Sequence, residues 1–194
     1  MTFTEAEVER HNALYKRAHS LIRPYILIDG ESRSARPGWF AKRHLRKGID
    51  LFHQALAINP ESWQNRFWIA KALQRLGDHK QAMSWFSEAL RIEPANVSVA
   101  KEAANEALEL GEHQLALSLL RPAVAQHPDD PALLHNLGLA LLLCGEAESA
   151  YQAFSGAARR QADRLTSQLM TLTERVLRGE ERLPQRLEDV RRDA

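Results

Sequence analysis

The stretch that decides the fold is "ALAINP" at residues 55–60, because near-copies of it recur along the chain, "ALRIEP" at 89–94 and "AVAQHP" at 123–128. The three copies are 34 residues apart. A glycine column, two alanine columns and a column of large apolar residues keep the same step: Gly77, Gly111 and Gly145; Ala82, Ala116 and Ala150; Ala89, Ala123 and Ala157; Phe86, Leu120 and Phe154. A fixed period of this length indicates a stack of equal structural units.

One such unit is predicted to be a helix, a turn and a second helix. Ser62, Asn96 and Asp130 share the period, and their side chains can accept hydrogen bonds from the free N–H groups of a helix start. Each is followed by helix-compatible residues and then by a glycine, which suits a left-handed C-terminal cap. Second helices are expected over 79–92, 113–126 and 146–160. Because one helix pair cannot bury its own apolar face, the pairs must stack.

The period and its Leu-Gly, Ala, Phe, Ala, Pro pattern resemble the tetratricopeptide repeat family over about two-thirds of the chain. The resemblance implies an all-α fold, a right-handed α-solenoid of stacked antiparallel helix pairs with N- and C-terminal capping helices. It also implies a concave groove, lined mainly by the first helix of each pair. The expected organisation is an N-terminal helix and irregular connector (1–36), a partial first repeat with a long helix (37–60), three repeats (61–162, divided into 61–94, 95–128 and 129–162), and a C-terminal capping helix with a charged tail (163–194).

The ends of the array carry their own signals. Residues 5–22 predict a helix that is the candidate for the missing first helix of the partial repeat. Residues 163–178 predict a capping helix that ends at Gly179, and the segment beyond it predicts a weak helix or a frayed tail. Pro122 lies inside a predicted second helix, where it cannot donate to the Ser118 carbonyl, so a kink or shift is expected there.

Composition limits the function classes. A chain of 194 residues with 44% hydrophobic residues can build a sizeable core, and a formal net charge of +1 argues against binding nucleic acid by bulk charge. Residues 1–47 hold ten Lys and Arg against five Asp and Glu, whereas residues 48–158 hold seven against thirteen. The single cysteine, Cys144, excludes an internal disulfide framework and fits a reducing compartment. With no secretory signal or membrane-spanning stretch, we expect a cytoplasmic protein without a membrane partner.

The sequence contains no motif that demands catalysis. It has no Gly-rich phosphate loop, no paired-cysteine zinc spacing and no nucleophile elbow, so we expect no catalytic residue, no metal and no cofactor. His79 and His113 occupy one column of successive repeats, where they replace the usual aromatic residue in packing. Cys144 continues a leucine column, which favours a buried and inert thiol.

The candidate functional surface is the groove that the resemblance implies. Its expected residues lie on one helix face at 34-residue intervals or flank that face: Phe67, Trp68, Lys71, Gln74, Arg75, Lys101, Asn105, Leu108, His135, Asn136, Leu139 and Leu142. The aromatic and cationic end of this set would favour an acidic segment of a partner. The "LGLALLL" face at residues 137–143 has two open interpretations, a cover by the C-terminal capping helix or docking of a partner's amphipathic helix.

One known specificity of the family is matched only in part. In members that bind the C-terminal carboxylate of heat-shock chaperones, a clamp of lysines, asparagines and an arginine grips the peptide end. Lys101, Asn105 and Asn136 match three places of that clamp, but the remaining two fall near Thr166 and Met170, which are not cationic. A complete clamp is therefore not expected.

The preferred functional hypothesis is a noncatalytic protein–protein interaction module, an adaptor, chaperone-like protein or assembly factor that binds a peptide or helix of another protein. The alternative is a nucleic-acid-binding protein that uses the basic N-terminal third. The acidic repeat region argues against this alternative, because it would repel the phosphates. Homo-oligomerisation is compatible with both.

The basic stretch "RPGWFAKRHLRKG" at residues 36–48 is predicted to open the long helix of the partial repeat. Trp39 and Phe40 are expected to pin the connector and the N-terminal helix. The cations that follow read as a solvated helix face, which would steer an acidic protein partner: Lys42, Arg43, Arg46 and Lys47.

Overall fold

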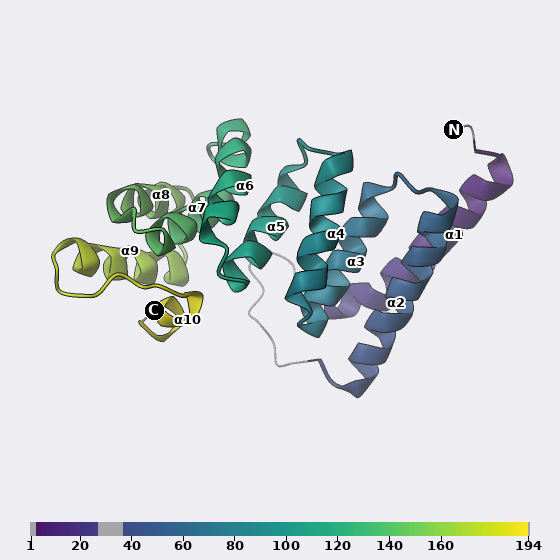
Figure 1. Cartoon of the computed structure of the whole chain (residues 1–194), viewed down its shortest axis with the longest axis horizontal. Helices are drawn as coiled ribbons and strands as arrows, with labels where there is room; N and C mark the ends of the chain where they lie inside the picture. Colours follow the sequence, from purple (N-terminus) through teal and green to yellow (C-terminus); the bar gives the residue numbers. More distant parts are fainter. Residues whose placement is uncertain (1–2, 27–36, 194) are drawn as a thin grey trace. The chain divides into compact units, whose positions relative to one another are not determined.

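All regular structure in the described part of the chain is helical (Figure 1). The structure is a computed structural model that describes residues 3–26 and 37–193. The chain forms two compact units, Met1–Val99 and Ala100–Ala194. No helix in the described ranges is both long and apolar enough to cross a membrane.

The first unit consists of two helix pairs. Its elements are α1 (Glu5–Ile22), the short 3₁₀ helix η1 (Arg23–Tyr25), α2 (Trp39–Ile58), α3 (Trp63–Leu76) and α4 (His79–Ile92). Helix α1 packs along α2, α2 packs on α3, and α3 packs along α4. Most of the expected irregular connector lies outside the described residues.

The second unit repeats the arrangement. Helix α5 (Val97–Glu109) spans the boundary and is followed by α6 (His113–Gln126), α7 (Pro131–Leu143), α8 (Ala147–Arg160), α9 (Arg164–Leu177) and α10 (Leu187–Asp193). Neighbouring helices pack from α6 to α9, and α9 also contacts α7. The predicted fold class, an all-α arrangement of packed helix pairs, is confirmed.

Side-chain caps fix where the helices begin, as the sequence predicts. The Ser62 hydroxyl accepts a hydrogen bond from the Asn65 N–H, and the Asp130 carboxylate accepts from the N–H groups at the start of α7. The amide oxygen of Asn96 accepts from the Val99 N–H at 3.1 Å. The turn glycines of the three repeats adopt positive φ angles of 77–87°, the left-handed conformation expected of a C-terminal cap.

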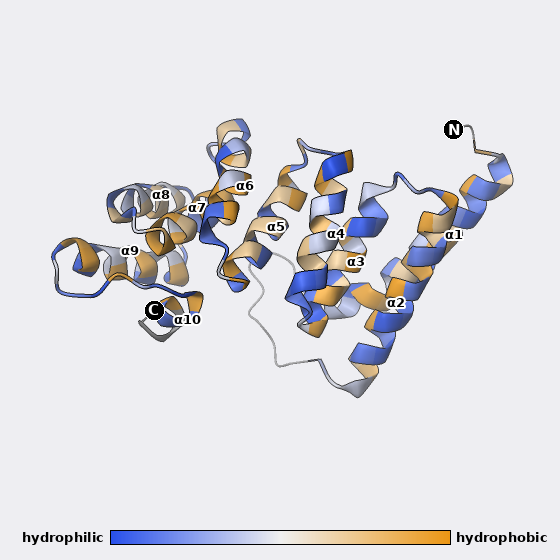
Figure 2. Ribbon diagram, in the orientation of Figure 1, coloured by the Kyte–Doolittle hydropathy of each residue, from blue (hydrophilic) through white to orange (hydrophobic). Residues whose placement is uncertain are grey.

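The repeated columns of the sequence form the core. All side chains of the alanine columns and of the large apolar column are at most 2% exposed. In Figure 2 most helices carry hydrophobic and hydrophilic residues side by side, as amphipathic helices do. Helix α6 runs continuously through Pro122. The expected kink there stays a prediction.

At the ends of the chain, one expectation needs correction and one open alternative is decided. Trp39 and Phe40 are 66% and 70% exposed, so the prediction that they pin the N-terminal helix is wrong. The reason is that they precede the part of α2 that α1 covers, because Tyr25 of η1 already lies beside His44. Of the two alternatives open for the segment beyond Gly179, a weak helix or a frayed tail, the described part contains a helix, α10, whose Leu187 and Val190 are 7% and 3% exposed.

The close packing of α7 on α8 gives a matched test of the core. A Cβ on Gly138 would lie 2.8 Å from ring atoms of the fully buried Phe154, whereas a Cβ on Gly156 would lie 3.4 Å from the Leu134 methyl. We expect Gly138→Ala to lower the free energy of unfolding by about 1–3 kcal/mol, measured by urea denaturation. Gly156→Ala is expected to be neutral or stabilising by up to about 1 kcal/mol, because alanine favours the helix. Equal effects of the two variants would contradict this packing.

Candidate functional site

The first helices of the pairs in the first unit, α1 and α3, meet through a polar and aromatic contact. The Trp68 indole N–H donates to the Tyr15 hydroxyl at 2.8 Å, and the His19 ring meets the Trp68 ring edge to face with centroids 4.6 Å apart. The Asn65 amide donates to His11 Nε2 at 3.0 Å. Helix α1 therefore contacts both α2 and α3, as the first helix of a pair does, and its role as the missing first helix of the partial repeat stays a prediction.

The groove residues predicted in this unit have interactions within it. Arg75 Nε donates to the Tyr25 carbonyl at 2.9 Å, and the Phe67 ring lies 5.8 Å from the ring of Phe86 on α4. Lys71 is only 7% exposed, and Gln74 is half-buried. Trp68 and Arg75 thus hold α1 and η1 in place. A role of this face in binding a partner stays a prediction.

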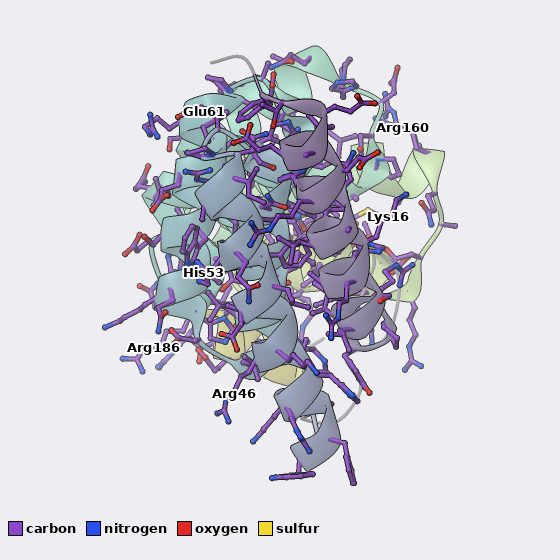
Figure 3. The ribbon with its side chains drawn as sticks, turned by 90° about the vertical axis from the view of Figure 1, so that its right-hand side faces the viewer. Lys16, Arg46, His53, Glu61, Arg160 and Arg186 are labelled. Atoms are coloured by element: carbon purple, nitrogen blue, oxygen red, sulfur yellow. The ribbon has the colours of Figure 1, made fainter. Side chains whose placement is uncertain are left out.

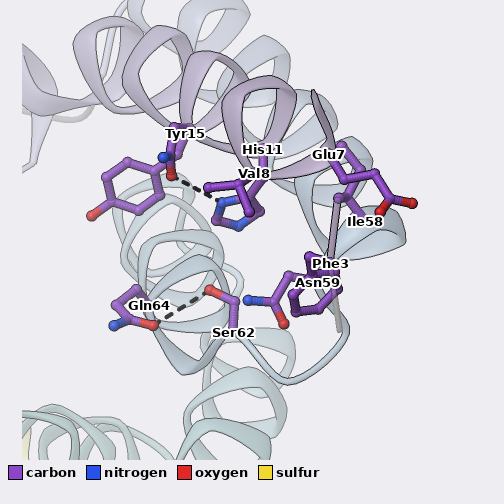
Figure 4. A pocket seen from close by; sticks show the side chains of 10 residues that line it. Phe3, Glu7, Val8, His11, Tyr15, Ile58, Asn59, Ser62 and Gln64 are labelled. Carbon is purple, nitrogen blue, oxygen red and sulfur yellow. Dashed lines mark hydrogen bonds between the residues drawn. The ribbon is translucent and has the colours of Figure 1, made fainter. Parts of the chain in front are cut away.

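A cavity that the sequence did not indicate lies beside the start of α1 (Figure 4). Its volume is about 420 Å³, and its lining comes from α1, the segment before it and the α2–α3 connection. Glu7 lines it; backbone and side-chain hydrogen bonds from Thr4 lower the pKa of this carboxyl. The other lining residues are Phe3, Val8, His11, Asn12, Tyr15, Ile58, Asn59, Ser62 and Gln64. The period alone does not predict the cavity, because most of its wall comes from residues 3–15, which lie outside the repeats, although Ile58, Asn59 and Ser62 belong to the repeated segments.

In the second unit, α5 and α7 are joined through two of the predicted groove residues. The Asn136 amide donates to the Asn105 amide oxygen at 2.9 Å. Lys101 and Leu139 lie one helical turn away on the same two helices, and they are half-buried, as the two asparagines are. The structure therefore brings together the polar centre of the predicted set. Leu108 and Leu142 are 2% and 0% exposed and belong to the core.

His135 connects α7 to the start of α9. Its Nδ1 lies 2.8 Å from the Thr166 hydroxyl oxygen, and that hydroxyl donates to the Asp163 carboxylate, which caps α9. Because the hydroxyl proton is already used, His135 Nδ1 must carry its own proton and donate it to Thr166. The Thr166 hydroxyl donates to a carboxylate, and Thr166 is only 2% exposed. The three side chains therefore form a structural network, and the hydroxyl is not an activated nucleophile.

The environment shifts the pKa values of this network in definite directions. Burial lowers the pKa of His135, and the nearby Asp163 carboxylate opposes the shift. Burial raises the pKa of Asp163, but hydrogen bonds from the Thr166 hydroxyl and from the backbone N–H groups of Leu165 and Thr166 outweigh it and leave that pKa below its usual range. At neutral pH the network therefore pairs a neutral imidazole with an ionised carboxylate.

Most of the leucine-rich stretch of α7 is covered within the second unit. Leu141, Leu142 and Leu143 are at most 6% exposed, whereas Leu137 and Leu139 are half-buried, and α9 packs on both α7 and α8. This favours the interpretation that the C-terminal helix covers the face. Cys144, at the end of α7, is half-buried, and burial raises the pKa of its thiol, with Glu146 adding to the shift. Such a thiol is a poor nucleophile at neutral pH.

Metal chemistry finds no support in the described ranges, since no three His, Cys, Asp or Glu side chains there gather closely enough to hold an ion.

The docking of α1 on α3 can be tested through the bond between Trp68 and Tyr15. Tyr15→Phe leaves the half-buried indole N–H without its acceptor, so we expect the free energy of unfolding to fall by about 1 kcal/mol. In a double-mutant cycle with Trp68→Phe, measured by urea denaturation, the coupling should be about 0.5–1.5 kcal/mol. Additive effects would show that the two side chains do not interact.

The lowered pKa of His135 predicts a pH dependence of stability. The unfolded chain takes up a proton near pH 6.5 but the folded chain only at lower pH, so the free energy of unfolding should fall as the pH drops through this window. His135→Asn keeps an N–H donor for Thr166 and cannot titrate. Urea denaturation at about pH 7.5 and about pH 5.5 should show a smaller loss for the variant than for the wild type. An equal loss would place the titration elsewhere.

Comparison with known proteins agrees with this geometry. A family model described as tetratricopeptide repeat matches residues 40–104 and 107–172. Among solved structures, MamA 41-end from Desulfovibrio magneticus RS-1 is 16% identical, with a TM-score of 0.74 over 95% of this chain and 91% of that chain. The structure titled for Pseudomonas aeruginosa pilF is 17% identical, with a TM-score of 0.69 over 90% and 72%. These likenesses show the fold alone.

No curated protein matches the sequence. The family match covers more than half of the chain and includes the three periodic repeats from which the fold was predicted. The chain therefore belongs to the tetratricopeptide repeat family.

Proposed function

We propose that this chain is a noncatalytic interaction module that binds a peptide or helix of another protein on the first-helix face of its second unit. Tetratricopeptide repeat proteins generally mediate protein–protein interactions and are typically noncatalytic, which supports this class of function. The observation that carries the proposal is the amide pair Asn105–Asn136. We name this pair with its neighbours Lys101, His135 and Leu139 the asparagine strip.

The amide pair has the chemistry that a peptide backbone requires. An asparagine side chain offers an acceptor oxygen and two N–H donors. The bond between the two amides uses only the oxygen of Asn105 and one N–H of Asn136. In the described structure neither amide has a second hydrogen-bond partner, so Asn105 keeps its N–H donors and Asn136 keeps its oxygen. These groups can pair with the C=O and N–H groups of a bound peptide whatever its sequence.

The neighbours of the amide pair add preferences for side chains. Lys101 lies one turn from Asn105, and its positive charge makes an anionic side chain of the partner more favourable here than a cationic one. Leu139 lies at the corresponding distance from Asn136 and offers apolar contact. The complete chaperone clamp has no counterpart, because Thr166 is 2% exposed and bonded to His135. The preferred ligand is therefore a segment with an acidic and an apolar side chain, rather than a peptide recognised through its terminal carboxylate.

An adaptor, chaperone-like or assembly role would all use this site in the same way. A cytoplasmic location is part of the proposal and is supported by the chain's single cysteine, which suits a reducing compartment.

Site-specific photocrosslinking tests the location of the site. A photoreactive amino acid at Leu139 should capture a partner protein in cells, whereas the same group at the exposed Gln114 on α6 should not. For a captured segment, Asn105→Ala/Asn136→Ala should weaken binding by about tenfold or more in calorimetry, because hydrogen bonds to the peptide backbone are lost.

The matched control is Ser118→Ala/Gln126→Ala, which alters two exposed residues on α6 and should leave the affinity unchanged. Thermal melting of both double variants checks that each remains folded. Crosslinking at Gln114 alone, or an unchanged affinity of the asparagine variant, would contradict the proposal.

A further inference from the structure

The start of α2 forms an exposed aromatic tip in the first unit. Trp39 and Phe40 are 66% and 70% exposed, more than any other large hydrophobic side chain in the described part of the chain. Their rings meet edge to face with centroids 4.8 Å apart, and the Arg43 guanidinium lies 5.8 Å from the Trp39 ring centroid. Two adjacent exposed aromatic side chains are unfavourable in water, which indicates an interaction surface.

The register of α1 against α2 shows that this tip projects. The Tyr25 hydroxyl lies 2.9 Å from His44 Nδ1, and the packing of Ile22 against Gly48 continues the same antiparallel register. Trp39 and Phe40 precede His44 by five and four residues, which places them about 6–8 Å farther along the axis of α2. The aromatic pair is thus the outermost part of this helix.

A belt of cations lies directly behind the tip. Lys42, Arg43, Arg46 and Lys47 are exposed on α2 and, with Trp39 and Asp50, surround a hollow of about 340 Å³. Figure 3 shows Arg46 on this part of α2 and Lys16 on the neighbouring α1. Residues 10–26 and 37–49 contain eight Lys and Arg and no Asp or Glu. The first turn of α2 also lacks an acidic residue, so the positive end of the helix dipole adds to the charge.

We propose that this tip, Trp39 and Phe40 with the cations Lys42, Arg43, Arg46 and Lys47, docks on the surface of an anionic lipid bilayer. The two rings enter the boundary between headgroups and acyl chains, and the cations contact the anionic headgroups behind them. Exposed aromatic residues and clustered cations are the two signals that together give stable peripheral attachment. The contact is peripheral, so it requires no membrane-spanning helix, although it departs from the sequence-based expectation of no membrane partner.

The layered order of the side chains favours a bilayer over other anionic partners. A bilayer has an apolar layer beneath a charged layer, which matches rings at the tip and cations behind them. A nucleic acid also combines phosphates with apolar base faces, so binding to duplex DNA is compared with binding to vesicles as an outcome of the test. An acidic protein would need a pocket that fits two projecting rings, whereas the lipid interface is soft and adapts to their shape.

Vesicle flotation tests the proposal with the full chain. We expect binding to vesicles of 30% phosphatidylglycerol in phosphatidylcholine and no binding to pure phosphatidylcholine at about 0.1 M salt. Trp39→Ala/Phe40→Ala should weaken the partition by about tenfold or more, and Arg43→Gln/Arg46→Gln by about 25-fold, at roughly fivefold for each cation. Asn105→Ala/Asn136→Ala should not change it, which separates this site from the peptide site.

Matched controls remove the same number of cations, or of apolar side chains, from other surfaces of the protein. Lys80→Gln/Arg91→Gln removes two exposed cations of α4, and Leu165→Ala/Leu177→Ala removes two exposed apolar side chains of α9. Both controls should bind like the wild type. Vesicles with brominated acyl chains should quench tryptophan fluorescence in the wild type but not in Trp39→Phe, which keeps an aromatic ring and should still bind.

Three results would overturn the proposal. The first is no binding to the anionic vesicles, and the second is binding that the aromatic variant does not weaken. The third is tip-dependent binding to duplex DNA or to a polyglutamate peptide that exceeds binding to the vesicles at equal anionic charge, which would assign the tip to that class of partner instead.

Discussion

The structure depends on a simple packing constraint: a pair of α-helices leaves an apolar face that only another helix can cover. Small residues at fixed positions allow the covering helix to approach closely. At Gly138 the backbone of α7 lies so near the Phe154 ring that even one added methyl group would clash. The two alanine columns, which lie on the second helix of each pair, likewise let a neighbouring helix approach closely, and all of these alanines are buried. Without these close approaches the large apolar column could not fill the space between pairs.

The same constraint explains why the ends of each unit are built differently from the middle. Helix α1 covers α3 through hydrogen bonds and ring contacts that use Trp68 and Asn65, and Arg75 of α3 holds η1. Helix α9 covers the leucine-rich side of α7 and is fixed to it through Thr166 and His135. Side chains that a sequence pattern places on a binding face are thus partly used to attach the covering helices.

These attachments leave two surfaces with unused chemistry in the described chain. The Asn105–Asn136 pair keeps hydrogen-bonding groups that suit a peptide backbone. The tip of α2 keeps two exposed rings and a belt of cations that suit an anionic surface. The first surface is shared by two neighbouring repeats, and the second lies at the start of the partial first repeat. A module with both could hold a protein segment and be recruited to a surface at the same time.

The sequence by itself determined the helices of the repeats and, to within a residue or two, their bounds. Capping residues such as Ser62 and Asp130 and the turn glycines act on their own neighbours, and the 34-residue period then repeats each helix. Local hydrogen bonds and a repeated apolar pattern can be recognised from the order of the residues alone. The predicted bounds of α1, α4 and α6 consequently agree with the structure to the residue.

Only the tertiary structure decided which side chains remain available to a partner. Trp68 loses its freedom because Tyr15, 53 positions earlier in the chain, lies against it. Trp39 stays exposed because Tyr25 of η1, just beyond the end of α1, already lies beside His44, so α1 does not reach the start of α2. Exposure depends on which distant segment covers a residue, and no local pattern in the sequence contains that information.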